Sequence, residues 1–122
     1  MFVAGRKDGA VAIVKARGRL GRDEVPELAG KVRETSGDDR FVVVNLSGVT
    51  EIVSAGIACL TELRDWCRRE GGRLALAELS PNVAEILGIT GLDALFVIMD
   101  TEAEAAEFLA EEAEEAEEAG KR

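Results

Sequence analysis

Short apolar runs typical of strands alternate along the chain with longer segments whose apolar residues recur at helical spacing. Phe2–Gly5 is apolar, Lys7–Gly9 has the composition of a turn, and Ala10–Gly18 is rich in β-branched residues. These segments predict an N-terminal β-hairpin. Acidic residues then precede Val25, Leu28, Ala29 and Val32, so residues 22–37 predict a helix that ends near a glycine.

The middle of the chain predicts a buried strand, a polar loop and a long helix. "RFVVVNL" (40–46) is almost uniformly apolar, as is typical of a strand buried on both faces of a parallel sheet. Residues 47–53 are more polar and predict a loop. From Ser54 onward the chain carries a helical apolar stripe, which Gly71–Gly72 is expected to end. The stripe consists of Ile57, Leu60, Leu63 and Cys67.

The same alternation continues after this helix. "RLALAEL" (73–79) predicts a strand, and "DALFVIM" (93–99) predicts the last one. Between them, "SPNVAEILGITG" (80–91) predicts a short helix with Ser80 as its N-cap and Gly88 at its end.

Thr101 and Glu104 match a capping box that opens a final helix. Beyond about Glu111 the Glu/Ala repeat favours either a solvated, fraying helix or a disordered tail, with an interaction tail as the sharper alternative. We therefore predict a domain over residues 1–110 and an acidic tail over residues 111–122. The side chains expected to pack against the domain are Ala105, Phe108, Leu109 and Ala113.

The order of these elements is β-β-α-β-α-β-α-β-α. Strand–helix alternation after a hairpin implies right-handed crossovers and a mainly parallel sheet. The sequence predicts one α/β domain with a mixed sheet of about five strands and about four helices. At 122 residues with 47% apolar residues, the chain is long enough to bury one core.

The net charge of −9 belongs mostly to the C-terminal segment. Residues 101–122 hold nine Glu and two bases, which leaves a net charge of −2 on residues 1–100. Because no basic stripe forms, nucleic-acid binding is not expected.

Side chains suited to catalysis are scarce. The sequence contains no His, the commonest general base and metal ligand at neutral pH. No glycine-rich nucleotide cradle and no cluster with metal-ligand spacing occurs outside the tail, and the central strand ends in Asn45 where a phosphate-accepting receiver would have Asp. We therefore expect no cofactor and no metal, and we expect the chain not to be an enzyme.

Cys59 and Cys67 lie eight residues apart in one predicted helix, about 12 Å along its axis, which is too far for a disulfide. Neither a signal peptide nor a run long enough to span a bilayer is evident, so we expect a cytoplasmic chain with reduced, packed thiols and no direct membrane insertion.

Ser54 admits two interpretations. Serine is a preferred N-cap residue, in which case Ser54→Ala should cost about 1 kcal/mol. Alternatively, a hydroxyl at the start of a helix is accessible to a kinase, and the helix end tolerates the phosphate charge. Gly56, two residues later, either allows another backbone to approach closely or is simply tolerated.

Two segments, "VVVNLSGVTEIVSAGIACLTEL" (42–63) and "SPNVAEILGITGLDALF" (80–96), together resemble the STAS domains, a family named for sulphate transporters and anti-sigma factor antagonists. The likeness runs over roughly residues 8–110. It implies a small regulator that binds an anti-sigma factor, often a serine kinase of GHKL type, and thereby regulates transcription indirectly.

In that family the kinase phosphorylates a Ser or Thr at the helix start, which ends the partnership, and a serine phosphatase restores it. The family pattern there is Asp-Ser-Ser-Gly or a close variant. Val53, Ser54, Ala55 and Gly56 occupy these places, so the resemblance makes Ser54 the phosphorylation site while the acid and the second hydroxyl are replaced.

The partner-binding surface is expected around Ser54, in the loop before it and in the first turn after it. An alternative is a non-phosphorylated scaffold subunit of a stressosome-like assembly or of a membrane lipid-transport complex. Whether the chain forms a homodimer is left open. The residues expected to touch the partner are Ser47, Gly48, Thr50, Glu51, Val53, Ala55, Gly56 and Ile57.

Overall fold

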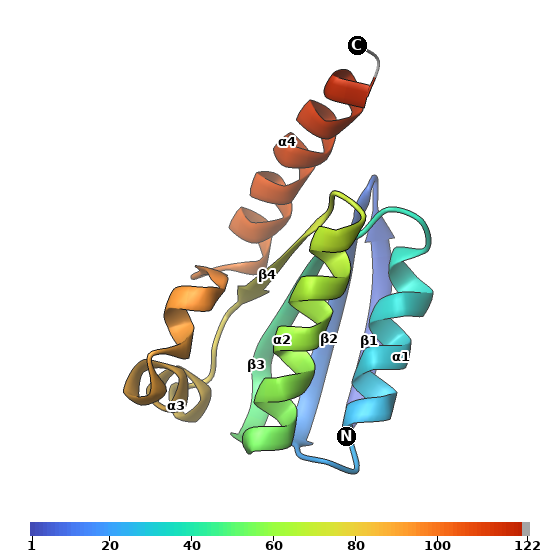
Figure 1. Cartoon of the computed structure of the whole chain (residues 1–122). Helices are drawn as coiled ribbons and strands as arrows, with labels where there is room; N and C mark the ends of the chain where they lie inside the picture. The colour runs from blue at the N-terminus through green and yellow to red at the C-terminus, as the bar shows by residue number, and fades with distance from the viewer. Residues whose placement is uncertain (121–122) are drawn as a thin grey trace.

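The computed structural model describes residues 1–120, which form a five-stranded sheet with helices on both faces (Figure 1). In chain order the elements are β1 (Phe2–Asp8), β2 (Val11–Leu20), α1 (Val25–Ser36), β3 (Phe41–Ile52), α2 (Ser54–Arg69), β4 (Arg73–Ala77), α3 (Pro81–Thr90), the 3-10 helix η1 (Leu92–Leu95), β5 (Val97–Met99) and α4 (Glu102–Gly120).

The strands follow one another across the sheet in the order β1-β2-β3-β4-β5. β1 pairs with β2 in an antiparallel hairpin, and the other three pairings are parallel. The predicted α/β class, the hairpin and the mainly parallel sheet are therefore confirmed.

Two separate cores cover the two faces of the sheet. The larger core joins α1, α2 and α3 to one face, and α1 and α2 lie in front of the sheet in Figure 1. The smaller core joins α4 to the other face through Ala105, Leu109 and Ala113, which pack on side chains such as Ile13 and Val43. Because both faces are covered, the first half of β3 is buried at every position, as its uniformly apolar sequence predicts.

The predicted loop at residues 47–53 is wrong, because β3 continues to Ile52. Its pairing with β2 shifts register twice, once between Asn45 and Gly48 and again between Val49 and Glu51. Each shift places one extra residue in β3, as in a β-bulge. The extra residues break the two-residue alternation, and a strand with broken alternation looks like a polar loop in the sequence.

The predicted last strand is also too long. α3 continues through Gly88 to Thr90, and Gly91 ends it in the left-handed conformation with φ 74°. Leu92–Leu95 then forms a 3-10 turn, so β5 covers only Val97–Met99. A left-handed residue just after the last helical turn is a common helix end, and glycine adopts it without a Cβ clash.

α4 runs without a break from Glu102 to Gly120. At its start, Glu104 N donates to Thr101 Oγ1 at 3.1 Å, which is one of the two hydrogen bonds of the predicted capping box. The division into a domain of residues 1–110 and a tail of residues 111–122 stays a prediction, and the last two residues lie outside the described chain.

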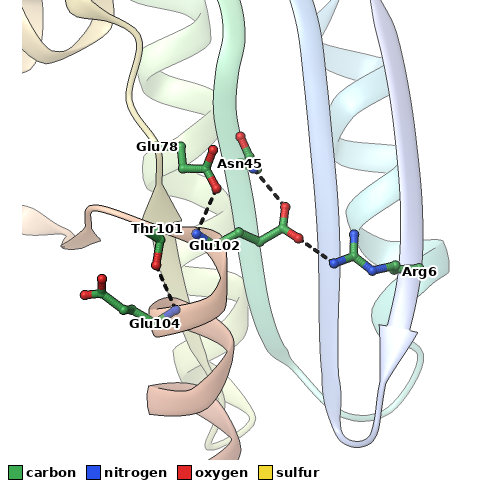
Figure 2. A network of polar contacts seen from close by, with 6 residues as sticks. All are labelled: Arg6, Asn45, Glu78, Thr101, Glu102 and Glu104. Carbon is green, nitrogen blue, oxygen red and sulfur yellow. Dashed lines mark hydrogen bonds and ion pairs between the residues drawn. The ribbon is translucent and has the colours of Figure 1, made fainter.

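Glu102 connects α4 to the sheet through a polar network (Figure 2). Its carboxylate accepts hydrogen bonds from the Arg6 guanidinium on β1 and from Asn45 Nδ2 on β3, the latter at 2.8 Å. Its backbone N–H donates to the Glu78 carboxylate at 2.9 Å. Glu78 is the one non-glycine residue of the described chain with a positive φ, 54°, so strained backbone holds this acceptor at the positive end of α4.

The ionised form of Glu102 is expected to stabilise the fold. Partial burial raises the pKa of this carboxyl, but the hydrogen bonds from Arg6 and Asn45 outweigh that effect and the net pKa is lowered. A lowered pKa stabilises the fold above the unfolded-state pKa of about 4.3, and this stabilisation disappears as the pH falls through the lower folded value. Glu102→Gln should therefore lower the free energy of unfolding at pH 7.

Urea unfolding of both proteins between neutral and acidic pH measures this effect, and the difference between them should close in acid. Glu104→Gln, in the same exposed first turn, is the matched control and should follow the wild type throughout. A difference that stays constant with pH would show that the Glu102 charge makes no contribution.

Candidate functional site

Asn45 is the point where β3 leaves the core of the sheet. It pairs with Ala77, the last residue of β4, and its side chain is only 1% exposed. Asn45 Oδ1 accepts a hydrogen bond from Ser47 N at 2.9 Å, inside the first register shift. The same side chain that binds Glu102 therefore also fixes the bulge that redirects β3.

Beyond Asn45 one edge of β3 has no strand beside it, because β4 has ended. Side chains from the start of α3 occupy that edge instead: Ser80 Oγ donates to Val49 O at 2.6 Å, and Asn82 Nδ2 donates to Thr50 O at 3.0 Å. Ser80 is the N-cap residue of α3, as predicted, but it makes no side-chain bond to that helix. The predicted N-cap position is confirmed, but the hydroxyl bonds to β3 instead of to the helix.

A shallow groove lies between the second half of β3 and the start of α3. Ser47, Gly48 and Thr50 line it from β3. Arg17 on β2 and Asn82 on α3 line it as well, and sequence reasoning missed both. Arg17 lies opposite Gly48 only because of the shifted register, so no local pattern in the sequence identifies it.

Ser54 is exposed and is the first residue of α2. The N-cap is Val53, whose backbone is extended and whose side chain cannot accept a hydrogen bond. Within residues 1–120 the Ser54 hydroxyl makes no hydrogen bond. The predicted capping role of Ser54 is therefore wrong by one position, and its hydroxyl is free for chemistry.

Gly56 is buried and fixes the position of α2 against the end of β2. A Cβ on Gly56 would lie 2.5 Å from Leu20 O and 2.8 Å from Leu20 Cγ. Leu20 O also accepts a hydrogen bond from Val53 N at 3.3 Å. Of the two explanations open from the sequence, the structure supports close approach of another backbone.

The predicted partner-binding residues fall into two neighbouring groups. Ser47, Gly48 and Thr50 belong to the groove, whereas Val53, Ser54, Ala55 and Ile57 surround the start of α2. Glu51 lies between the two groups and pairs with Arg19 at 3.2 Å. Gly56 is buried, so it can influence this surface only by setting the position of α2. Contact of these residues with a partner stays a prediction.

The two cysteines are poor nucleophiles. Both are free and buried on the inner side of α2. Burial raises the pKa of Cys59 to about 11 and that of Cys67 to about 12, so both are thiols at neutral pH. This agrees with the expected packed, reduced state.

Over residues 1–120, no group of three or more His, Cys, Asp or Glu side chains is arranged to hold a metal ion. No helix of the same region has both the length and the apolar composition needed to cross a bilayer.

Known proteins are similar to this chain in sequence and in fold. Residues 3–99 match the family described as "Mlab, STAS domain". An anti-sigma factor antagonist of Bordetella bronchiseptica, BtrV, is 35% identical over 83 residues, which cover 67% of this chain and 69% of BtrV.

Solved structures agree with this assignment. The crystal structure of an anti-sigma factor antagonist of Thermotoga maritima superposes with a TM-score of 0.78 at 23% identity, over 88% of this chain and 93% of that one. The anti-sigma factor antagonist SpoIIAA in its unphosphorylated form superposes with a TM-score of 0.76 at 19% identity, over 89% and 96% of the two chains. At these identities the two structures show a shared fold.

Ser54→Ala should leave the free energy of unfolding within about 0.5 kcal/mol of the wild type, because it removes an exposed hydroxyl without a partner. Thr101→Ala is the control, since Thr101 does cap a helix, and it should cost about 1 kcal/mol. Urea unfolding followed by the fluorescence of the single Trp, Trp66 in α2, measures both. A cost of 1 kcal/mol for Ser54→Ala would restore the capping role.

Gly56→Ala should destabilise the fold by about 1–3 kcal/mol, because the new methyl group would overlap Leu20. Gly88→Ala is the matched control: Gly88 also lies in a helix, but a Cβ there meets nothing within 4 Å. Alanine at position 88 should be neutral or stabilising by up to about 1 kcal/mol. Equal behaviour of the two variants in the same assay would contradict the close approach.

Proposed function

The chain belongs to the STAS domain family, and we propose on that premise that it is an anti-sigma factor antagonist. Its partner is an anti-sigma factor of the kinase type, which docks on the groove and on the first turn of α2. Phosphorylation of Ser54 by that partner ends the complex, and a serine phosphatase reverses it. Transcription is thereby regulated indirectly, with no cofactor and no catalytic step on this chain.

The observation that carries the proposal is the free hydroxyl of Ser54 at the N-terminus of α2. A kinase needs an exposed hydroxyl, and one already engaged in capping would have to leave its hydrogen bond first. BtrV, a curated relative at 35% identity, is itself described as an anti-sigma factor antagonist.

The position also suits the charge that phosphorylation adds. A phosphoserine carries about −1.5 to −2 charges at pH 7, and the first backbone N–H groups of a helix favour negative charge. The first turn of α2 holds no acidic residue that would repel the phosphate. The modified chain therefore keeps its fold and changes only the surface that a partner meets.

The helix start and the edge of β3 are held in place, so a phosphate on Ser54 would act directly on partner binding. Gly56 seats α2 on β2, and Ser80 and Asn82 hold the edge of β3. Because the helix start cannot move away, the phosphate stays in the docking surface. A partner that contacts this surface must then desolvate the phosphate or dissociate.

A second function is a constitutive scaffold subunit, in which Ser54 is never modified. The residues beside Ser54 favour this alternative, since Val53 and Ala55 offer neither an acid nor a second hydroxyl to an approaching kinase. The family description "Mlab, STAS domain" does not distinguish the two functions.

Intact-mass measurement and peptide mapping of the chain, isolated from its native cells in growth and under stress, test the proposal. We expect one phosphate, on Ser54, whose occupancy changes with condition. Ser54→Ala should abolish it. Thr90→Ala, which removes an exposed hydroxyl at the end of α3 and outside the docking surface, should leave the phosphate occupancy of Ser54 unchanged. A chain that stays unmodified while a known phosphoprotein of those cells is detected would favour the scaffold.

A further inference from the structure

We propose that a second site, at the opposite end of α2 from Ser54, binds a small organic phosphate. We call it the basic pocket and define it by Arg64, Arg68, Arg73, Leu95, Phe96 and Glu112. It lies where the end of α2 meets the start of β4, and residues of η1 and α4 complete its walls. The inference does not rest on the proposed function.

Three guanidinium groups from two different elements line one hollow. Arg64 and Arg68 come from the last turns of α2, and Arg73 is the first residue of β4. One carboxylate, that of Glu112, faces them, so the lining side chains carry two positive charges in excess. This excess stands out in a chain whose net charge is −9.

Helix-dipole compensation does not explain the cluster. Basic residues in the last turn of a helix offset the negative end of its dipole, and Arg68 and Arg69 suit that role. Arg73 lies outside the helix, on the adjoining strand, and it lines the same hollow. A convergence of elements is typical of a binding site, whereas a dipole effect needs one helix alone.

Arg73 is held in place before any ligand arrives. Its guanidinium lies 5.4 Å from the centre of the Phe108 ring and pairs with the Glu112 carboxylate. The only ion pair of Arg64 in the described chain is with the adjacent Asp65, at 3.1 Å, and the Asp65 side chain is half exposed. The Arg68 guanidinium makes no ion pair or hydrogen bond within the part of the chain that the structure describes. One arginine is thus preorganised and another is available.

The chemistry and size of the pocket favour a phosphate that carries a small apolar group. Guanidinium groups bind phosphate oxygens through paired, charge-assisted hydrogen bonds. Leu95, 41% exposed, and Phe96 offer an apolar wall beside the arginines. The hollow has a volume of about 520 Å³, within the range of roughly 300–1,000 Å³ typical of small-molecule sites.

Calorimetric titration with phenyl phosphate and with inorganic phosphate tests the proposal. Phenyl phosphate should bind several-fold more tightly, because its ring adds apolar contact. Arg68→Gln should weaken its binding about tenfold or more, as expected for the loss of hydrogen bonds to a charged group. Arg69→Gln, the neighbouring exposed arginine outside the pocket, is the matched control and should change binding less than about twofold.

Glu112→Gln should change the affinity for phenyl phosphate in the opposite direction to Arg68→Gln. Removing the carboxylate takes a negative charge away from the phosphate, while the Phe108 ring still holds Arg73, so binding should tighten. No variant here touches Ser54, and Trp66 fluorescence verifies that each is folded. Absence of phenyl phosphate binding, or an equal effect of Arg68→Gln and Arg69→Gln, would overturn the proposal.

A lipid headgroup presents the same chemistry, and vesicles containing phosphatidate distinguish the two sources. Phenyl phosphate binding without vesicle binding supports a soluble ligand. Vesicle binding that phenyl phosphate displaces supports the same pocket with a lipid as the source. Vesicle binding that phenyl phosphate leaves unchanged would show that the lipid binds elsewhere, and a soluble phosphate would then be the ligand of the basic pocket.

Discussion

The second half of β3 is the constraint on which the rest of the structure depends. Asn45 fixes it from inside, by donating to Glu102 of α4 and accepting from Ser47 in the bulge. Two extra residues then turn the strand away from β4 toward the start of α2. One buried amide therefore bonds both to the last helix, on one face of the sheet, and to the bulge that leads to the proposed partner-binding surface.

The start of α2 is held in position by its packing next to the end of this strand. Gly56 packs so closely on Leu20 that a Cβ there would lie 2.5 Å from Leu20 O. Leu20 ends β2 and pairs with Ile52 at the end of β3. A switch at Ser54 then needs no movement of the fold, because the phosphate alone changes the surface. In the proposed function the chain contributes a fixed shape and one hydroxyl, and the chemistry belongs to the partner.

The sequence predicted the elements whose pattern is local, and it failed where contacts across the fold decide. The uniformly apolar first half of β3 and the stripe of α2 were identified because burial dictates each position. The extension to Ile52 was missed because bulges break the alternation. The bond from the Ser80 hydroxyl to Val49 was missed because that carbonyl is distant in sequence. The capping role of Ser54 was wrong by one residue, within the usual uncertainty of helix ends. Arg68 and Arg73 are separated by one short turn, but only the fold brings Phe96 and Glu112 to the same hollow.

The most direct test compares the affinity of the anti-sigma factor for the unmodified chain and for a chain with phosphoserine incorporated at Ser54. Phosphothreonine at Thr90, exposed at the end of α3 and outside the docking surface, is the matched control for added charge and should leave the affinity unchanged. Phosphoserine at Ser54 should weaken binding about tenfold or more and leave the free energy of unfolding unchanged. Equal affinity of the two chains would contradict a switch at Ser54 and leave the scaffold function as the better description.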